Sequence, residues 1–225
     1  MLALDVLLAA GAALYFEQTV VTYADGRATG PGVVSRVWFA GERMRMEAGL
    51  APESPAFILR LDRHKAYRVD PVARTVTEID ADALRSQAQM DLSMAGDLMG
   101  ASEDSRVRAT NLPPKTIAGY PCQGFRLSAG ATRLEVYTTR SLPLGIDAFA
   151  EFLEWSGAEQ ALGPLLAEIR KLPGFPLETH SSVSVLGRVH ETLSTVTRVD
   201  LAPPAPALFE PPAGYRTLAA EPPEP

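Results

Sequence analysis

The feature that most constrains this chain is a succession of short strand-like runs over residues 15–80, each closed by a turn signal. The run LYFEQTVVTY is rich in aromatic and β-branched residues and stops at an Ala-Asp-Gly turn. In RMRMEA, Met44 and Met46 alternate with charged residues, so one face of that strand is apolar and the other is polar. The pattern predicts an antiparallel meander.

Two segments change to helical spacing. One lies between residues 80 and 100, and the other begins near residue 146 and continues after a Gly-Pro pair as the helix LLAEIRKL. The helical stripes carry the large apolar residues Met90, Met94, Ile146, Phe149 and Phe152. Strand character returns over residues 116–139 and in a closing hairpin over residues 177–200. We therefore expect an α+β fold: a curled antiparallel β-sheet, or half-barrel, with helices covering its concave face.

The chain is long enough to bury a sizeable core and is expected to form a single domain over residues 15–216. Residues 1–14 contain an apolar run of signal-peptide length without a basic start, which indicates a degraded or truncated export signal or, alternatively, a short element leading into the domain. The run is too short to span a bilayer, so we do not expect an integral membrane protein. Residues 217–225 are expected to be a disordered proline-rich tail, whereas Phe209 and Tyr215 are expected to pack back on the domain.

Charge and motifs narrow the function classes. The net charge is −6 with no concentrated basic stretch, which argues against nucleic acid as a partner. No P-loop, GxGxxG, GxSxG or HExxH sequence is present. The carboxylates Asp62, Asp70, Glu78 and Asp80 fall at turns and strand ends, where aspartate is a common turn residue. We expect a non-enzymatic protein without a cofactor.

Cys122, the only cysteine, lies in the run GYPCQGF at the start of an expected strand. A catalytic thiol needs a base and a pKa-lowering environment, and the three histidines lie in other hairpins. We interpret Cys122 as a small packing residue, with a reactive thiol and a metal ligand as alternatives. His180 and His190 lie on adjoining strands, but folding that hairpin places His190 opposite Val183, so the two imidazoles are not paired and no metal site is expected.

The apolar residues allow two interpretations, an ordinary core or the lining of a cavity between sheet and helices. Unbranched methionines suit a flexible acyl chain. The residues proposed as cavity lining are Trp38, Met44, Met46, Phe57, Met90, Met94, Phe149 and Phe152.

Several runs together resemble a family of uncharacterised bacterial exported domains placed with the LolA-like outer-membrane lipoprotein-carrier superfamily. The runs are RMRMEAG, FILRLDRHKAYRVDP, KTIAGYPCQGF, LGIDAFAEFLEW, GFPLET and LFEPPAGY, and the resemblance covers most of the chain, from about Tyr15 to Tyr215. The resemblance implies a curled sheet covered by helices, a periplasmic or envelope location, and a cavity for a lipid or lipoprotein acyl chain. The carriers hold their lid with a cavity arginine; here Arg36, Arg43, Arg45 and Arg60 lie on expected strands, but no motif identifies an equivalent.

Two non-enzymatic functions stay open from the sequence, beside a less favoured one, an enzyme that would use Cys122 or a pair of carboxylates. The first is a non-enzymatic envelope protein that binds a hydrophobic ligand in a half-barrel cavity. The alternative is an envelope protein-interaction or sensor module with a filled core, which would contact an envelope protein through a sheet edge or the proline-rich segment.

Overall fold

A computed structural model describes residues 13–80, 106–155, 164–185 and 187–219. Most of these residues belong to one large sheet. Its strands, in chain order, are β1 (Ala13–Ala24), β2 (Arg27–Ala28), β3 (Val33–Ala40), β4 (Arg43–Ala48), β5 (Ala56–Arg60), β6 (Lys65–Asp70), β7 (Thr75–Asp80), β8 (Arg108–Ile117), β9 (Tyr120–Ala129), β10 (Thr132–Thr139), β11 (Phe175–Val185), β12 (Arg188–Asp200) and β13 (Arg216–Ala219). The expectation of a mostly antiparallel sheet is confirmed.

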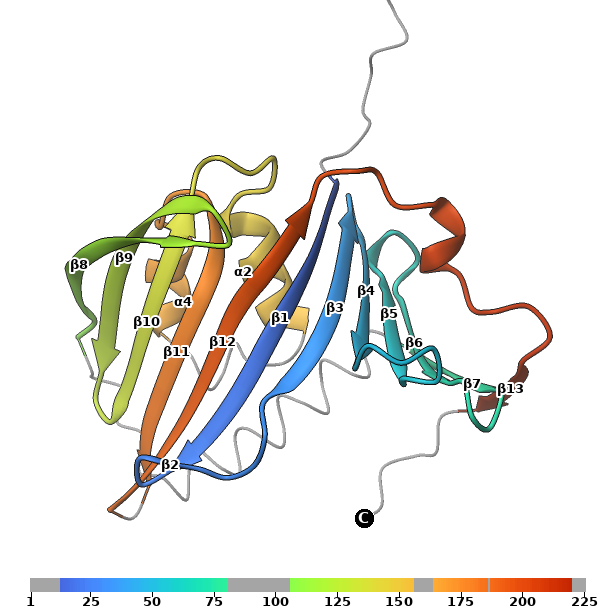
Figure 1. The fold of residues 1–225 in the computed structure, drawn as a ribbon, viewed down its shortest axis with the longest axis horizontal. Helices are drawn as coiled ribbons and strands as arrows, with labels where there is room; N and C mark the ends of the chain where they lie inside the picture. Colours follow the sequence, from blue (N-terminus) through green and yellow to red (C-terminus); the bar gives the residue numbers. More distant parts are fainter. Residues whose placement is uncertain (1–12, 81–105, 156–163, 186, 220–225) are drawn as a thin grey trace, which may run out of the picture.

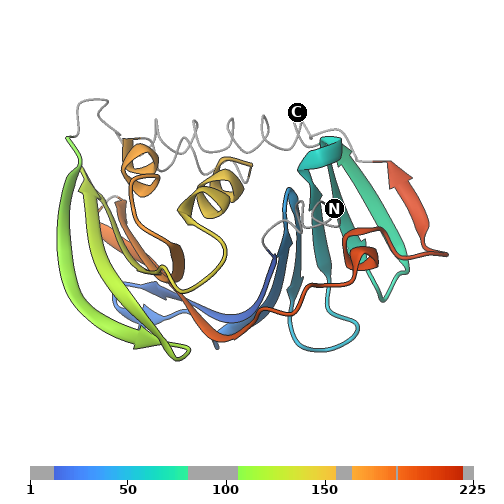
Figure 2. The same ribbon diagram turned by 90° about the horizontal axis from the view of Figure 1, so that it is seen from above.

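The sheet consists of two meanders joined through its middle. Its order is β13-β7-β6-β5-β4-β3-β1-β12-β11-β10-β9-β8, with β2 beside β1 (Figure 1). Every pair in this order is antiparallel except β13 with β7, which is parallel. The sheet curls strongly but does not close, because β13 and β8 stand at opposite ends of it (Figure 2).

Two α-helices, α2 (Ile146–Trp155) and α4 (Pro164–Ile169), lie inside the curl over one half of the sheet (Figure 2). Their apolar residues pack with Leu127 of β9 and with Leu134 and Val136 of β10. The second helical region of the sequence is thereby confirmed. The first, between residues 80 and 100, lies outside the described residues, so a concave face covered entirely by helices stays a prediction.

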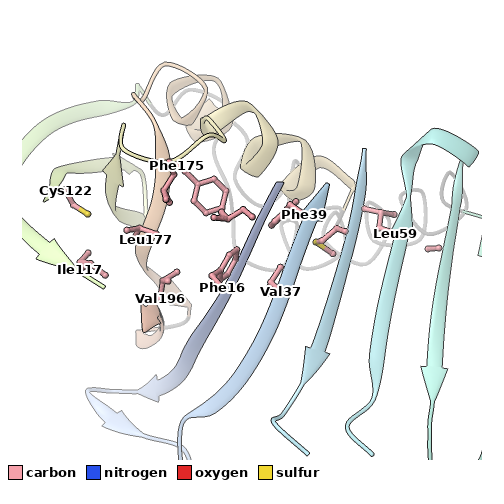
Figure 3. Packing of buried hydrophobic residues seen from close by; sticks show 13 residues of the cluster. Phe16, Val37, Phe39, Leu59, Ile117, Cys122, Phe175, Leu177 and Val196 are labelled. Carbon is pink, nitrogen blue, oxygen red and sulfur yellow. The ribbon is translucent and has the colours of Figure 1, made fainter. Parts of the chain in front are cut away.

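The sheet buries side chains on both of its faces. On the inner face, which carries the helices, the largest cluster includes Phe16, Phe39 and Phe175 (Figure 3). On the outer face of the β5–β7 region, a smaller cluster gathers around Ile58, which is fully buried. Ile58 lies between two residues of the inner cluster in β5, so strict strand alternation explains the two-sided burial.

The connection from α4 into β11 depends on Gly174. Its φ of +74° lies in the left-handed region, and a Cβ there would stand 2.1 Å from the carbonyl oxygen of Thr139. This tight approach sets the start of β11, and therefore the position of the Phe175 ring in the inner cluster.

The C-terminal segment, residues 201–215, crosses the outer side of the β3–β5 region and is called the strap below (Figure 1). It contains a short 3-10 helix, Pro206–Phe209, in which Phe209 is completely buried. Arg45 donates to the carbonyl oxygen of Leu208 at 3.1 Å, and Arg60 donates to that of Phe209 at 3.3 Å. The prediction that Phe209 packs back on the domain is confirmed.

The two edge strands of the sheet, β13 and β8, differ from the expectation. Residues 217–219, expected to be part of a disordered tail, belong to β13 (Arg216–Ala219), which pairs in parallel with β7; the rest of the expected tail lies outside the described residues. The strap leads from the outer face to the β7 edge of the sheet, and Tyr215, the last residue before β13, packs against the outer cluster. Most of β8 was not expected from the sequence, because its Pro113-Pro114 pair is unusual in a strand. The pair lies at a register shift on the sheet edge, where missing amide donors are tolerated.

Candidate functional site

A cavity of about 280 Å³ lies on the inner face, between the middle strands and helix α2. Strands β1, β3, β4, β11 and β12 form its floor. Its lining residues are Phe16, Gln18, Val20, Val37, Phe39, Met44, Met46, Phe149, Leu153, Phe175, Pro176, Leu177, Glu178, Thr179, Thr192, Ser194 and Val196. The size approaches the lower end of the range typical of small-molecule sites.

The apolar end of the cavity is built by register. Phe16 of β1 pairs with Val37 of β3, and Phe39 pairs with Met44 of β4, so these side chains stand side by side on one face. The ring of Phe175 packs edge-on against Phe16 at 5.8 Å and against Phe39 at 6.1 Å between ring centroids. Figure 3 shows Phe16, Val37, Phe39 and Phe175 converging from three different strands.

Helix α2 supplies the opposite side of the cavity. Ile146 and Ala150 are buried against the sheet with α4. Phe149 and Leu153, one helical turn apart, line the cavity. The cavity is therefore bounded by aromatic and aliphatic groups from both the sheet and a helix.

The other end of the cavity is polar. Gln18, Thr179, Thr192 and Ser194 come from three adjacent strands, β1, β11 and β12. The Ser194 hydroxyl donates to Oε1 of Gln18 at 2.9 Å. The one charged side chain of the described lining, Glu178, accepts hydrogen bonds from Lys115 and from Thr195, the latter at 3.2 Å.

Three of the eight residues predicted to line the cavity do so: Met44, Met46 and Phe149. Phe57 does not belong to the lining, but it pairs with Met46 in register and packs against the same inner cluster. Met90 and Met94 lie outside the described residues. Phe152 belongs to helix α2, but its side chain is not among those described.

Trp38 is corrected by the structure. It lies between Val37 and Phe39, which line the cavity, so alternation turns Trp38 to the outer face. There it packs against Tyr15 with ring centroids 5.0 Å apart, and the guanidinium of Arg36 lies 5.8 Å from its ring. Burial and a hydrogen bond to Glu17 raise the pKa of Tyr15 to about 12.

The lining residues that the sequence missed are mainly Phe16, Phe175 and the polar group around Gln18. Phe39 and Val37 could have been found by placing Met44 and Met46 on the inner face and following the hairpin register back. Phe16 and Phe175 have no such local signal, because their proximity depends on the β1–β12–β11 pairing across the middle of the sheet.

Cys122 is buried, as predicted, and its Sγ donates to the carbonyl oxygen of Tyr120 at 3.4 Å. Burial raises the pKa of the thiol, which disfavours the nucleophilic thiolate. The interpretation as a packing residue is confirmed; it belongs to the inner cluster together with Ile117 and Leu177 (Figure 3).

The histidines and carboxylates considered from the sequence do not gather at one site in the described part of the chain. His190 pairs with Val183, as expected, while His180 lies 3.2 Å from Glu191. No three His, Cys, Asp or Glu side chains gather as a metal site in the described part of the chain. Asp62 accepts hydrogen bonds from two of the three guanidinium nitrogens of Arg60, which lowers the pKa of its carboxyl.

The strand arginines lie away from the cavity. Arg36 and Arg45 both pair with Glu47, at 2.6 and 2.8 Å, and Arg60 pairs with Asp62 at 2.7 Å. Arg43 lies over the ring of Phe209 in the strap at 5.2 Å. None of the four belongs to the described lining, so these arginines stabilise the outer face instead.

Comparison with known proteins finds one matching family and several similar solved structures. Residues 33–215 match the model described as a domain of unknown function, DUF4412. No curated protein matches the sequence. None of the helices in the described ranges is long and apolar enough to cross a membrane.

The similar solved structures share little sequence with this chain. An uncharacterised conserved protein from Thermus thermophilus has a TM-score of 0.49 and 8% identity, with 93% of this chain and 91% of that chain covered. MucB in the Pseudomonas aeruginosa MucA/MucB complex has a TM-score of 0.44 and 13% identity, and the match covers 92% of this chain but only 59% of that one. A domain described as a putative outer membrane lipoprotein-sorting protein from Vibrio parahaemolyticus has a TM-score of 0.32 and 7% identity, covering 85% and 86%. These likenesses assign no activity.

Proposed function

We propose that this chain, which belongs to the DUF4412 family of domains of unknown function, binds the acyl chain of a lipid or lipoprotein in its inner-face cavity. We further propose that it is non-enzymatic and acts in the bacterial envelope after export. The observation that carries the proposal is the cavity of about 280 Å³ with Phe16, Phe39, Phe175 and two methionines in its lining. A filled core, which the interaction-module alternative requires, does not agree with this cavity.

The volume sets the length of chain that the cavity accepts. At the roughly 30 Å³ that one water-sized group occupies in a liquid, the cavity holds about nine methylene groups. Burial of a methylene contributes about 0.8 kcal/mol, so a full cavity supplies at most about 7 kcal/mol. Before the losses of association, this corresponds to a Kd on the order of 10 µM.

The strap gives little support to the alternative function, a protein-interaction or sensor module. Phe209 was one end of the segment suggested as a contact for a partner protein, but it is fully buried against this chain's own outer face. Tyr215, at the other end, packs against the outer cluster. The segment is therefore occupied within the fold.

A series of 1-alkanols from hexanol to undecanol tests the proposal by calorimetric titration. Affinity should tighten about fourfold per methylene, the equivalent of about 0.8 kcal/mol, and level off near about nine carbons, when the cavity is full. If no alkanol binds, the proposed function is refuted and the interaction module takes its place.

Val20 and Val21 offer a matched pair of variants. Val20 lines the cavity and Val21, the next residue of β1, points to the other face. Both are half-buried, so the fold should accept a long side chain at either position. Val20→Arg should abolish alkanol binding by filling the cavity with a charged side chain, and Val21→Arg should leave it unchanged. Equal binding by the two variants would place the ligand elsewhere.

A further inference from the structure

The two ends of the cavity differ in chemistry, and the difference follows the strands. On β12, Val196 lies at the apolar end, and Ser194 and Thr192 follow at alternate positions toward the polar end. On β11, Leu177 is likewise followed by Thr179, which pairs with Ser194. A ligand that fills the cavity therefore has one end among aromatic rings and the other among hydroxyl and amide groups.

The hydrogen bond between Ser194 and Gln18 orients the polar end. The Ser194 hydroxyl donates to Oε1 of Gln18, and no side chain or carbonyl of the described residues accepts from its Nε2 group, which can therefore donate to a ligand. The hydroxyls of Thr179 and Thr192 can each donate and accept. These side chains offer both kinds of hydrogen-bonding partner without a charge.

The electrostatics oppose an anionic head group. No arginine or lysine belongs to the cavity lining within the described ranges. The lining does contain the carboxylate of Glu178, whose partner Lys115 is already engaged. A carboxylate or phosphate placed here would lose water without gaining a counter-charge, which is unfavourable.

We propose that the cavity selects an amphiphile with an uncharged, hydrogen-bonding head group, such as an acyl glycerol, over an anionic one, such as a fatty acid. The proposal rests on the proposed function, because it concerns the polar end of the same cavity. The apolar end holds the chain, and the group of Gln18, Thr179, Thr192 and Ser194 receives the ester and hydroxyl oxygens of the head.

Monohexanoylglycerol and hexanoate, which carry the same acyl chain, provide the test by calorimetry. Their short chain leaves part of the cavity of about 280 Å³ for the head group. At about pH 8 hexanoate is ionised, and we expect monohexanoylglycerol to bind at least about tenfold more tightly, because burial of an unpaired charge is unfavourable. Equal or tighter binding of hexanoate would overturn the proposal while leaving acyl-chain binding intact. Loss of both, together with no alkanol binding, would refute the proposed function as well.

Matched substitutions separate the polar contacts from general packing. Thr192→Val and Gln18→Leu keep the approximate volume of the side chain and remove hydrogen-bonding groups. Each should weaken the binding of monohexanoylglycerol about two- to tenfold and weaken that of nonanol, which has a single hydroxyl, by less. Thr19→Val makes the same threonine-to-valine change on the opposite face of β1 and should alter neither. Unchanged binding of monohexanoylglycerol by both Thr192→Val and Gln18→Leu would show that the head group lies elsewhere and would overturn the proposal.

Discussion

Replacing Phe209 by alanine should destabilise the whole domain, although this residue lies in a proline-rich segment near the C-terminus. The side chain is completely buried, and the guanidinium of Arg43 lies 5.2 Å from its ring. Truncation of a buried phenylalanine costs about 3–5 kcal/mol, and in a chain of this length about 2–4 °C of Tm accompany each kcal/mol. Phe209→Ala should therefore lower Tm by about 6–20 °C in a calorimetric melt.

The same strap provides the control. Leu201 is half-exposed at 48%, so Leu201→Ala should change the free energy of unfolding by no more than about 0.5 kcal/mol. A loss below about 1 kcal/mol for Phe209→Ala would refute the reasoning, because it would mean that the strap does not dock on the outer face in solution.

A double-mutant cycle with Arg60 examines how the strap is held. Arg60 is 3% exposed, binds Asp62 with two nitrogens, and also binds Glu210 and the carbonyl oxygen of Phe209. Arg60→Met and Phe209→Ala remove contacts within one network, so their effects should be non-additive by about 0.5–3 kcal/mol. Additive effects would show that the guanidinium and the buried ring stabilise the fold independently.

Single residues elsewhere in the fold give three more tests. Gly174→Ala should lower Tm by several degrees more than Gly119→Ala, because both glycines have positive φ but only Gly174 would also press a Cβ against backbone; equal melts would contradict this. Native Cys122 should be alkylated at neutral pH far more slowly than in the urea-unfolded chain, since burial raises the pKa of its thiol, and equal rates would contradict its burial. Asp62 has a lowered carboxyl pKa through Arg60, so its stabilising effect is present above the usual carboxyl range and is lost as pH falls through the lowered value. Asp62→Asn should therefore reduce stability near neutrality, and this deficit should shrink as pH falls below the usual carboxyl range; a deficit independent of pH would contradict the ion pair.

The sequence predicted those parts of the fold that depend on local patterns. Alternation around Met44 and Met46 predicted that both share one apolar face, and in the structure that face is the inner one; Phe149, on the predicted helical stripe, lies on the other side of the cavity. The assignment of Trp38 to the cavity lining was wrong, because its position between two lining residues turns its side chain to the outer face.

Long-range pairing accounts for most of what could not be predicted. The meeting of Phe16 with Phe175 requires β1 and β11 to flank β12, and no local pattern specifies that arrangement. The strap is a similar case: the sequence indicated that Phe209 packs back on the domain, but not that Arg45 and Arg60 bind the backbone on either side of the ring.

Native mass spectrometry of the protein purified gently from a bacterial envelope, followed by solvent extraction, tests acyl-chain binding most directly. We expect a stoichiometric mass excess that extraction identifies as an acyl-chain amphiphile with an uncharged head group, and we expect Val20→Arg to lack this excess while Val21→Arg retains it. A clean mass for the unmodified chain, together with no alkanol binding, would contradict the proposed function.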